Sequence, residues 1–179
     1  MFSLFRKFLE QLTGKHPPLR PPGAIPEKEF EKKCIRCRKC VEVCPYDSIE
    51  VAHGEWGIKM GTPIIYAREI PCYLCMKCPP VCPSNALLPI TQKEEVKMGL
   101  AVINEVTCLP FNGVICRACY ERCPIYRKAI TLRDEIYPVV YEEYCTGCGI
   151  CENVCLTNPS SIVVNSKHFT NIMKIGENE

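Results

Sequence analysis

Sixteen cysteines are the residues of this 179-residue chain that are best suited to chemistry, and they fall into four groups of four with none left over. In chain order the groups are Cys34, Cys37, Cys40 and Cys44; Cys72, Cys75, Cys78 and Cys82; Cys108, Cys116, Cys119 and Cys123; and Cys145, Cys148, Cys151 and Cys155. Their first members lie 38, 36 and 37 residues apart, which is an internal repeat. Thiolates select soft metal centres, so the repeat predicts metal binding.

The spacing within the groups indicates which metal centre they bind. The first group, C-I-R-C-R-K-C-V-E-V-C-P, has the C-x2-C-x2-C-x3-C-P spacing of bacterial two-cluster ferredoxins, in which the fourth cysteine binds the other cluster. The second group repeats this pattern, and the fourth keeps every cysteine but has Leu156 in place of the proline. The groups therefore predict four [4Fe–4S] clusters with all sixteen cysteines as iron ligands.

The third group departs from the pattern, because seven residues separate Cys108 from Cys116. We predict that Cys108 is still a ligand, since one cluster would otherwise have three cysteines; an open iron corner is the alternative. Zinc sites use separated pairs of cysteines, and cysteines so close together compete for the same disulfide partners, so the spacing favours iron–sulfur over both. The chain has no nucleophile with its base, no haem-attachment motif and no dinucleotide-binding motif, and we predict that it is not an enzyme.

Charge and targeting features bound the location and the partners. The first 26 residues contain neither an apolar segment of signal-peptide length nor a twin-arginine pair, and no run approaches the length of a transmembrane segment. We therefore expect a cytoplasmic protein, in which thiols stay reduced. The formal charge of +2 treats each cysteine as neutral; four clusters with their thiolates bring the total to about −6, which argues against nucleic acid as a partner.

The pattern between the groups predicts the fold. Short β-favouring runs follow the groups at 49–52, 87–90, 129–132 and 162–164 and precede the later ones at 63–66, 101–106 and 138–141, so we expect a β-hairpin between each pair of consecutive groups. The predicted class is α+β, with two intertwined bacterial-ferredoxin-like (2[4Fe–4S]) units. Residues 1–29 are predicted to form an amphipathic helix and a proline-rich docking arm, 30–165 the four-cluster polyferredoxin domain, and 166–179 a C-terminal tail. The helix would pack on its own domain or dock to a partner or membrane surface.

Three further motifs extend the resemblance to known families: R-P-P-G-A at 20–24, G-T-P…A-R-E-I-P-C at 61–72, and E-Y-C-T-G-C-G at 143–149. With the four groups they resemble the ferredoxin-type proteins associated with periplasmic nitrate reductase and methylamine utilisation. The chain also looks like the small iron–sulfur subunit of tungsten-containing aldehyde oxidoreductases, and the missing export signal favours that likeness.

The second likeness implies an electron-transfer subunit that carries single electrons between a large, metallopterin-containing catalytic subunit and another redox partner, such as a further electron-carrier subunit. The alternatives are a quinol-linked nitrate-reductase-type module, a freely diffusing polyferredoxin, and an assembly scaffold without redox turnover.

Two expectations concern how the groups work together. By analogy with four-cluster subunits of molybdopterin enzymes, we predict nested pairing, in which the first group shares ligands with the fourth and the second with the third; sequential pairing is the alternative. Basic residues surround the first group, and Glu142, Glu143 and Glu152 lie about the fourth. Either these charges merely solvate the surface, or they make the fourth group's cluster the hardest to reduce and help the first group to dock an acidic partner.

Overall fold

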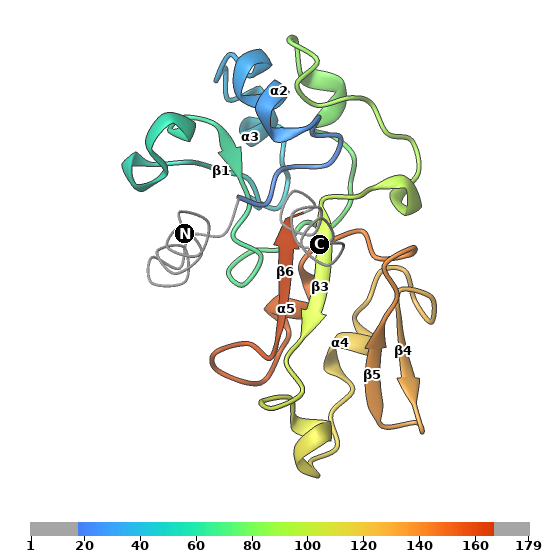
Figure 1. Cartoon of the computed structure of the whole chain (residues 1–179). Helices are drawn as coiled ribbons and strands as arrows, with labels where there is room; N and C mark the ends of the chain where they lie inside the picture. The colour runs from blue at the N-terminus through green and yellow to red at the C-terminus, as the bar shows by residue number, and fades with distance from the viewer. Residues whose placement is uncertain (1–17, 167–179) are drawn as a thin grey trace, which may run out of the picture.

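The structure, a computed structural model, describes residues 18–166, so the predicted N-terminal helix and almost all of the C-terminal tail lie outside it. The described chain forms two halves built from short helices and two-stranded antiparallel sheets, one half above the other in Figure 1. In this part of the chain no helix has both the length and the apolar character needed to cross a bilayer. The mixture of short helices and small sheets agrees with the predicted α+β class.

The halves follow the same plan, in which two cysteine groups flank a central hairpin. The first half contains α2 (Glu27–Lys33), α3 (Lys39–Glu42), β1 (Glu50–Val51), the 3₁₀ turn η1 (Gly54–Lys59), β2 (Pro63–Ile64) and η2 (Pro79–Val81), and η3 (Lys93–Glu95) links it to the second. The second half contains β3 (Gly99–Ile103), η4 (Leu109–Asn112), α4 (Ala118–Glu121), β4 (Ile130–Arg133), β5 (Tyr137–Val140), α5 (Ile150–Asn153) and β6 (Ile162–Ser166).

Strand pairing explains why each half is a closed unit. The hairpins predicted between the first and second groups and between the third and fourth groups are present as β1–β2 and β4–β5. The hairpin predicted between the second and third groups is wrong. Strand β3 pairs instead with β6 over five residue pairs, from Gly99 opposite Ser166 to Ile103 opposite Ile162. The run at 87–90 turns back to the start of the first half, where Leu87 bridges Ala24.

The proline-rich segment from Pro18 is this outer strand of the first half, and the prediction of a free docking arm is wrong for it. Leu19 bridges Ile65, and both side chains are buried. The Arg20 guanidinium is 2% exposed and donates to both carboxylate oxygens of Glu27, at 2.6 and 3.0 Å. Burial raises the pKa of Glu27, but the hydrogen bonds and charge of Arg20 outweigh it and lower that pKa overall. Packing thus continues across the predicted boundary at residue 30.

The two halves meet along the loops of the second and fourth cysteine groups. The Cys72 N–H donates to the Cys148 carbonyl at 2.9 Å, and Arg68 donates to the carbonyls of Glu152 and Cys155 at 2.7 and 2.9 Å. The Asn153 amide returns the contact by donating to the carbonyls of Arg68 and Glu69. Carbonyls at the end of α5, which have no partner within the helix, are therefore satisfied by the other half.

The apolar core is small and includes cysteines. One buried cluster combines Phe30, Leu87 and Val96 with the thiols Cys72, Cys78 and Cys148. The other has Ala101, Ile130 and Ile162 around Cys145 and Cys151. Part of what these residues pack against in the loaded protein is therefore the centre that the cysteines hold.

Candidate iron–sulfur centres

The sixteen cysteines meet in four quartets, and each quartet takes its first three members from one group and its fourth from a neighbouring group. Quartet A is Cys34, Cys37, Cys40 and Cys82; quartet B is Cys44, Cys72, Cys75 and Cys78; quartet C is Cys108, Cys116, Cys119 and Cys155; and quartet D is Cys123, Cys145, Cys148 and Cys151. Within residues 18–166, no three His, Cys, Asp or Glu side chains gather as they would around a single metal ion.

This arrangement is the sequential alternative, so the nested pairing predicted from sequence is wrong. Cys82 lies with the first group rather than the third, and Cys155 lies with the third rather than the first. The reason is the strand pairing. Because the β1–β2 hairpin joins the first two groups and Leu87 returns to Ala24, the end of the second group is brought back to the first. The β3–β6 pair has the same effect on the third and fourth groups.

The three-cysteine loops of the first, second and fourth groups share one backbone shape. In each loop the residue before the second cysteine and the residue after it have positive φ. These residues are Arg36 and Arg38, Leu74 and Met76, and Gly147 and Gly149. Only glycine adopts this conformation without cost, so the first two loops hold strain of the kind found at functional sites. One result of this shape is that the Leu74 N–H donates to Cys72 Sγ at 3.4 Å.

The third loop is built differently, as its seven-residue spacing implied. Residues 109–112 form η4, which ends at Gly113 with φ +78°. Arg117, in the position of Arg38, has an ordinary φ of −128°. Cys108 nevertheless lies beside Cys116, Cys119 and Cys155 in one pocket. The geometry therefore agrees with the prediction that Cys108 belongs to this centre.

Hydroxyl groups two residues after Cys82 and Cys155 were missed by the sequence analysis. Ser84 Oγ lies 3.7 Å from Cys82 Sγ, and Thr157 Oγ1 lies 3.2 Å from Cys155 Sγ. Burial raises the pKa of both thiols, but these contacts and nearby N–H groups outweigh it, so that the pKa of Cys82 is lowered and that of Cys155 falls to about 7. The recurring C-x-S/T after the second and fourth groups was the available signal.

Most of the other thiols have the opposite shift, and it provides a test of the cofactor. Burial, with repulsion from neighbouring sulfurs adding to it, raises the pKa of Cys40, Cys72 and Cys119 to about 12. Four thiolates so placed need a compensating positive charge. An iron–sulfur core supplies that charge and takes thiolate as its ligand. The all-sulfur donor sets and the N–H groups aimed at sulfur fit a [4Fe–4S] centre in each quartet.

The quartets follow one another in the order A, B, D, C. Repulsion from Cys40 of quartet A contributes to the raised pKa of Cys78 in quartet B. Cys72 of quartet B is hydrogen-bonded to Cys148 of quartet D, and Cys119 of quartet C repels Cys151 of quartet D. Quartets B and D are inner ones with buried cysteines, whereas no cysteine of quartet A or C is buried.

Comparison with known proteins agrees with this architecture. A family model described as "4Fe-4S dicluster domain" matches residues 33–86, which contain the first two groups and thus quartets A and B. The chain is 43% identical over 160 residues to the ferredoxin-type protein NapG of Escherichia coli, covering 82% of this chain and 69% of that protein. It is 40% identical over 157 residues to the methylamine utilization ferredoxin-type protein MauM of Methylorubrum extorquens, covering 82% and 71%.

A more distant relative is the ferredoxin-type protein NapF of Haemophilus influenzae, 26% identical over 159 residues, which cover 78% of this chain and 76% of that protein. These relatives support the first resemblance drawn from the sequence and lend no support to the likeness with tungsten aldehyde oxidoreductase subunits. They are ferredoxin-type proteins, so the chain is an electron carrier rather than an enzyme. It belongs to the NapG/MauM family of ferredoxin-type proteins.

Proposed function

We propose that the chain is a relay of four [4Fe–4S] clusters that carries single electrons between two redox partners of a quinol-linked oxidoreductase system. Each cluster, when bound, cycles between two oxidation states that differ by one electron. The residues of the chain hold and space the clusters and exclude water from the inner two.

The observation that carries this proposal is the unbroken series of quartets A, B, D and C. Electron tunnelling falls steeply with distance, so neighbouring centres must lie close together. The Cys72–Cys148 hydrogen bond brings two ligand residues of different halves into direct contact. The Arg68 and Asn153 bonds hold the halves in this register. A relay with exposed ends and a buried middle follows from this order.

The choice of system is supported by the relatives. NapG and MauM proteins match most of the chain, and they favour the nitrate-reductase-type alternative over a tungsten enzyme as the setting. A metallopterin catalytic subunit is not part of the proposal. We propose the cytoplasm as the compartment, because sixteen reduced thiols are needed for assembly; fractionation of the native host and detection of the chain in the soluble cytoplasmic fraction tests that separately.

The test of the function is reversible reduction of the protein isolated without oxygen. We expect about sixteen iron and about sixteen acid-labile sulfur per chain, four of each per cubane. We also expect full reduction by dithionite and return to the oxidised spectrum on adding an electron acceptor. Membrane vesicles energised with a quinol should reduce the same clusters. Clusters that resist reduction, or zinc in place of iron, would show a structural scaffold instead of a relay.

A further inference from the structure

Quartet A is the most open of the four centres. Of the sixteen cysteines, all of which lie in the described residues, Cys37 alone is exposed. Its neighbours Ile35 and Arg38 are exposed too, with Ile35 at 64%. By contrast, Cys148 of quartet D is 7% exposed. A cluster held by quartet A would therefore reach the protein surface, where another redox protein can approach it.

Apolar side chains from a second segment extend this surface. Ile58 and Met60 are 81% and 57% exposed, and they belong to the segment around η1. The Arg36 side chain fixes this segment against the first cysteine loop by donating to the carbonyls of Met60 and Ile58, at 2.9 and 3.2 Å. Ile35, Ile58 and Met60 thus form an apolar patch that is held in place before any partner arrives.

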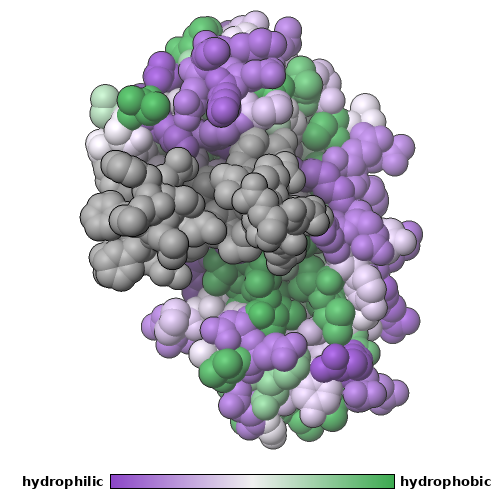
Figure 2. Space-filling model, in the orientation of Figure 1, coloured by the Kyte–Doolittle hydropathy of each residue, from purple (hydrophilic) through white to green (hydrophobic). Residues whose placement is uncertain are grey.

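The rim of the patch is strongly basic. Residues 32–42 contain five basic side chains, Lys32, Lys33, Arg36, Arg38 and Lys39, against the single carboxylate of Glu42. The ion pairs of this half, from Arg20 to Glu27 and from Lys59 to Glu27 and Glu31, include none of these five. At the top of Figure 2 the surface over α2 and α3 is accordingly mostly hydrophilic. The charge is free to act on an approaching protein.

Two of these arginines stand where glycine would be easier. Arg36 and Arg38 have φ of 57° and 64°, and the equivalent positions in the fourth loop are Gly147 and Gly149. Gly149 is required there, because a Cβ would lie 2.3 Å from the Cβ of Ala67. The inner loop is shaped to receive the other half, whereas the outer loop places charge at the surface in spite of the strained backbone.

The other exposed end, at quartet C, lacks this charge. Val106, Val114, Ile115 and Leu156 are 83%, 52%, 79% and 71% exposed around it. Residues 105–117 carry only one acidic and one basic side chain, Glu105 and Arg117. The two ends of the relay are therefore different in chemistry, and the basic charge is specific to the end at quartet A.

We propose that the surface formed by Ile35, Ile58, Met60, Lys33, Arg38 and Lys39 is the docking site for an acidic one-electron carrier protein. The proposal rests on the relay function proposed above. Charge complementarity brings the carrier to the rim, and the apolar patch supports contact beside Cys37. One electron then passes between the carrier and the cluster of quartet A, and the direction is set by their potentials. An anionic membrane is disfavoured as the occupant because the helices here, α2 and α3, have only seven and four residues, too short to lie in an interface as an amphipathic helix.

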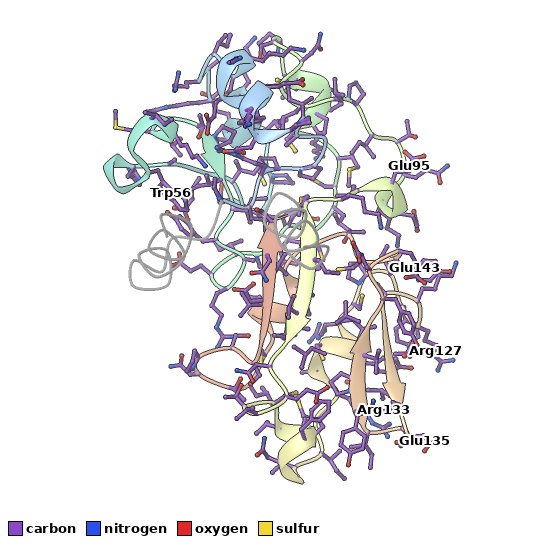
Figure 3. All side chains as sticks on the ribbon, in the orientation of Figure 1. Trp56, Glu95, Arg127, Arg133, Glu135 and Glu143 are labelled. Carbon is purple, nitrogen blue, oxygen red and sulfur yellow. The ribbon has the colours of Figure 1, made fainter. Side chains whose placement is uncertain are left out.

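The test measures association of the oxidised, cluster-loaded protein with a plant-type [2Fe–2S] ferredoxin, used as an acidic probe, by calorimetry at low and high salt. The triple variant Lys33→Gln, Arg38→Gln and Lys39→Gln should weaken the complex at least about tenfold at low salt. A matched control removes the same charge elsewhere, at Arg127, Lys128 and Arg133. Figure 3 shows Arg127 and Arg133 beside the β4–β5 hairpin, away from α2 and α3. This control should change the dissociation constant less than about twofold.

Further arms separate the explanations. Carbodiimide coupling should link probe carboxylates to Lys32, Lys33 or Lys39. Ile58→Ser should weaken binding while leaving its salt dependence unchanged. Equal weakening by the two triple variants, salt-independent binding, or the absence of binding would overturn the proposal, as would tighter binding of this face to phosphatidylglycerol vesicles than to the probe. Any of these results with clusters that still reduce reversibly would leave the relay function intact, whereas clusters that do not reduce would refute the function itself.

Discussion

The inner quartets B and D and the outer quartets A and C use the same ligands in different surroundings. Cys72 and Cys148 are buried and joined by a backbone hydrogen bond across the two halves. Cys37 and Cys116 face a surface that carries exposed apolar side chains such as Ile35 and Ile115. Cysteine spacing thus creates a centre, while the packing around it decides whether the centre meets another centre or another protein.

The fourth and first loops show the same difference in the backbone. Both loops turn through two residues of positive φ, yet the fourth uses glycine at both and the first uses arginine at both. Gly147 and Gly149 allow close approach, since a Cβ at Gly147 would lie 2.2 Å from the Gly99 nitrogen. The interior of the relay is therefore specified by the absence of side chains, and its end by their charge.

Removal of iron should have the largest effect, because it abolishes the difference between inner and outer centres. The apolar clusters depend on Cys72, Cys145 and Cys151, and structural metal binding contributes on the order of 10 kcal/mol in small domains. We expect the chelated, apo chain to lose its cooperative thermal transition by circular dichroism. Holoprotein taken through the same buffers without chelator is the control. A cooperative melt of the apo chain would contradict this view of the core.

Loss of one ligand should separate the two classes of centre. Cys37→Ser removes an exposed thiol, so we expect a folded protein that keeps at least about twelve iron, three cubanes' worth. Cys148→Ser leaves a buried position at the junction of the halves without its ligand, and we expect about eight iron or fewer and little soluble protein. Iron analysis of both variants, prepared side by side without oxygen, checks this. Equal iron contents would mean that burial does not distinguish the centres.

A single methyl group should sharpen the comparison. Gly149→Ala places a Cβ against Ala67 at φ +84°, and such overpacking costs about 1–3 kcal/mol. Gly113→Ala, at φ +78° in the outer third loop, has no atom within 4 Å of the added Cβ and should cost only the backbone strain, about 1 kcal/mol. The midpoint of thermal cluster loss, followed by visible absorbance, should fall further for Gly149→Ala. The reverse order would argue against close packing of the halves at this loop.

The reduction potentials should show the smallest difference. Burial disfavours the more negative, reduced form, and solvent exposure and nearby positive charge favour it. The clusters of quartets B and D should therefore be harder to reduce than those of A and C, and D, with Glu143 nearby, the hardest. Arg38→Gln should lower the potential of quartet A alone. A redox titration followed by electron paramagnetic resonance measures both, and four equal potentials would show that these surroundings have no effect.

The sequence predicted local features well and long-range ones poorly. The four cysteine groups, the hairpins at 50–64 and 130–140 and the odd third loop were all visible in spacing and composition. The pairing of the groups was not, because their nearly constant separation suits nested and sequential arrangements equally. The contacts that decide between them are the Ala24–Leu87 bridge and the β3–β6 ladder, which join residues some sixty apart.

Two other features escaped for related reasons. The segment from Pro18 was expected to be an exposed arm because of its prolines, yet Pro21 and Pro22 are fully buried. An outer strand that makes only isolated bridges needs few of the N–H groups that proline lacks. Ser84 and Thr157 were missed because a lone hydroxyl beside a cysteine has no distinctive pattern until two equivalent ones are compared.

The most direct test of the account is diffraction at the iron absorption edge from crystals of the protein prepared without oxygen. We predict four cubanes in the order A, B, D, C, with Cys82 Sγ bound to the cluster of Cys34, Cys37 and Cys40, and Cys155 Sγ bound to the cluster of Cys108, Cys116 and Cys119. Cys82 bound to the cluster of the third group, fewer than four cubanes, or clusters of B and D on opposite sides of the molecule would contradict the relay.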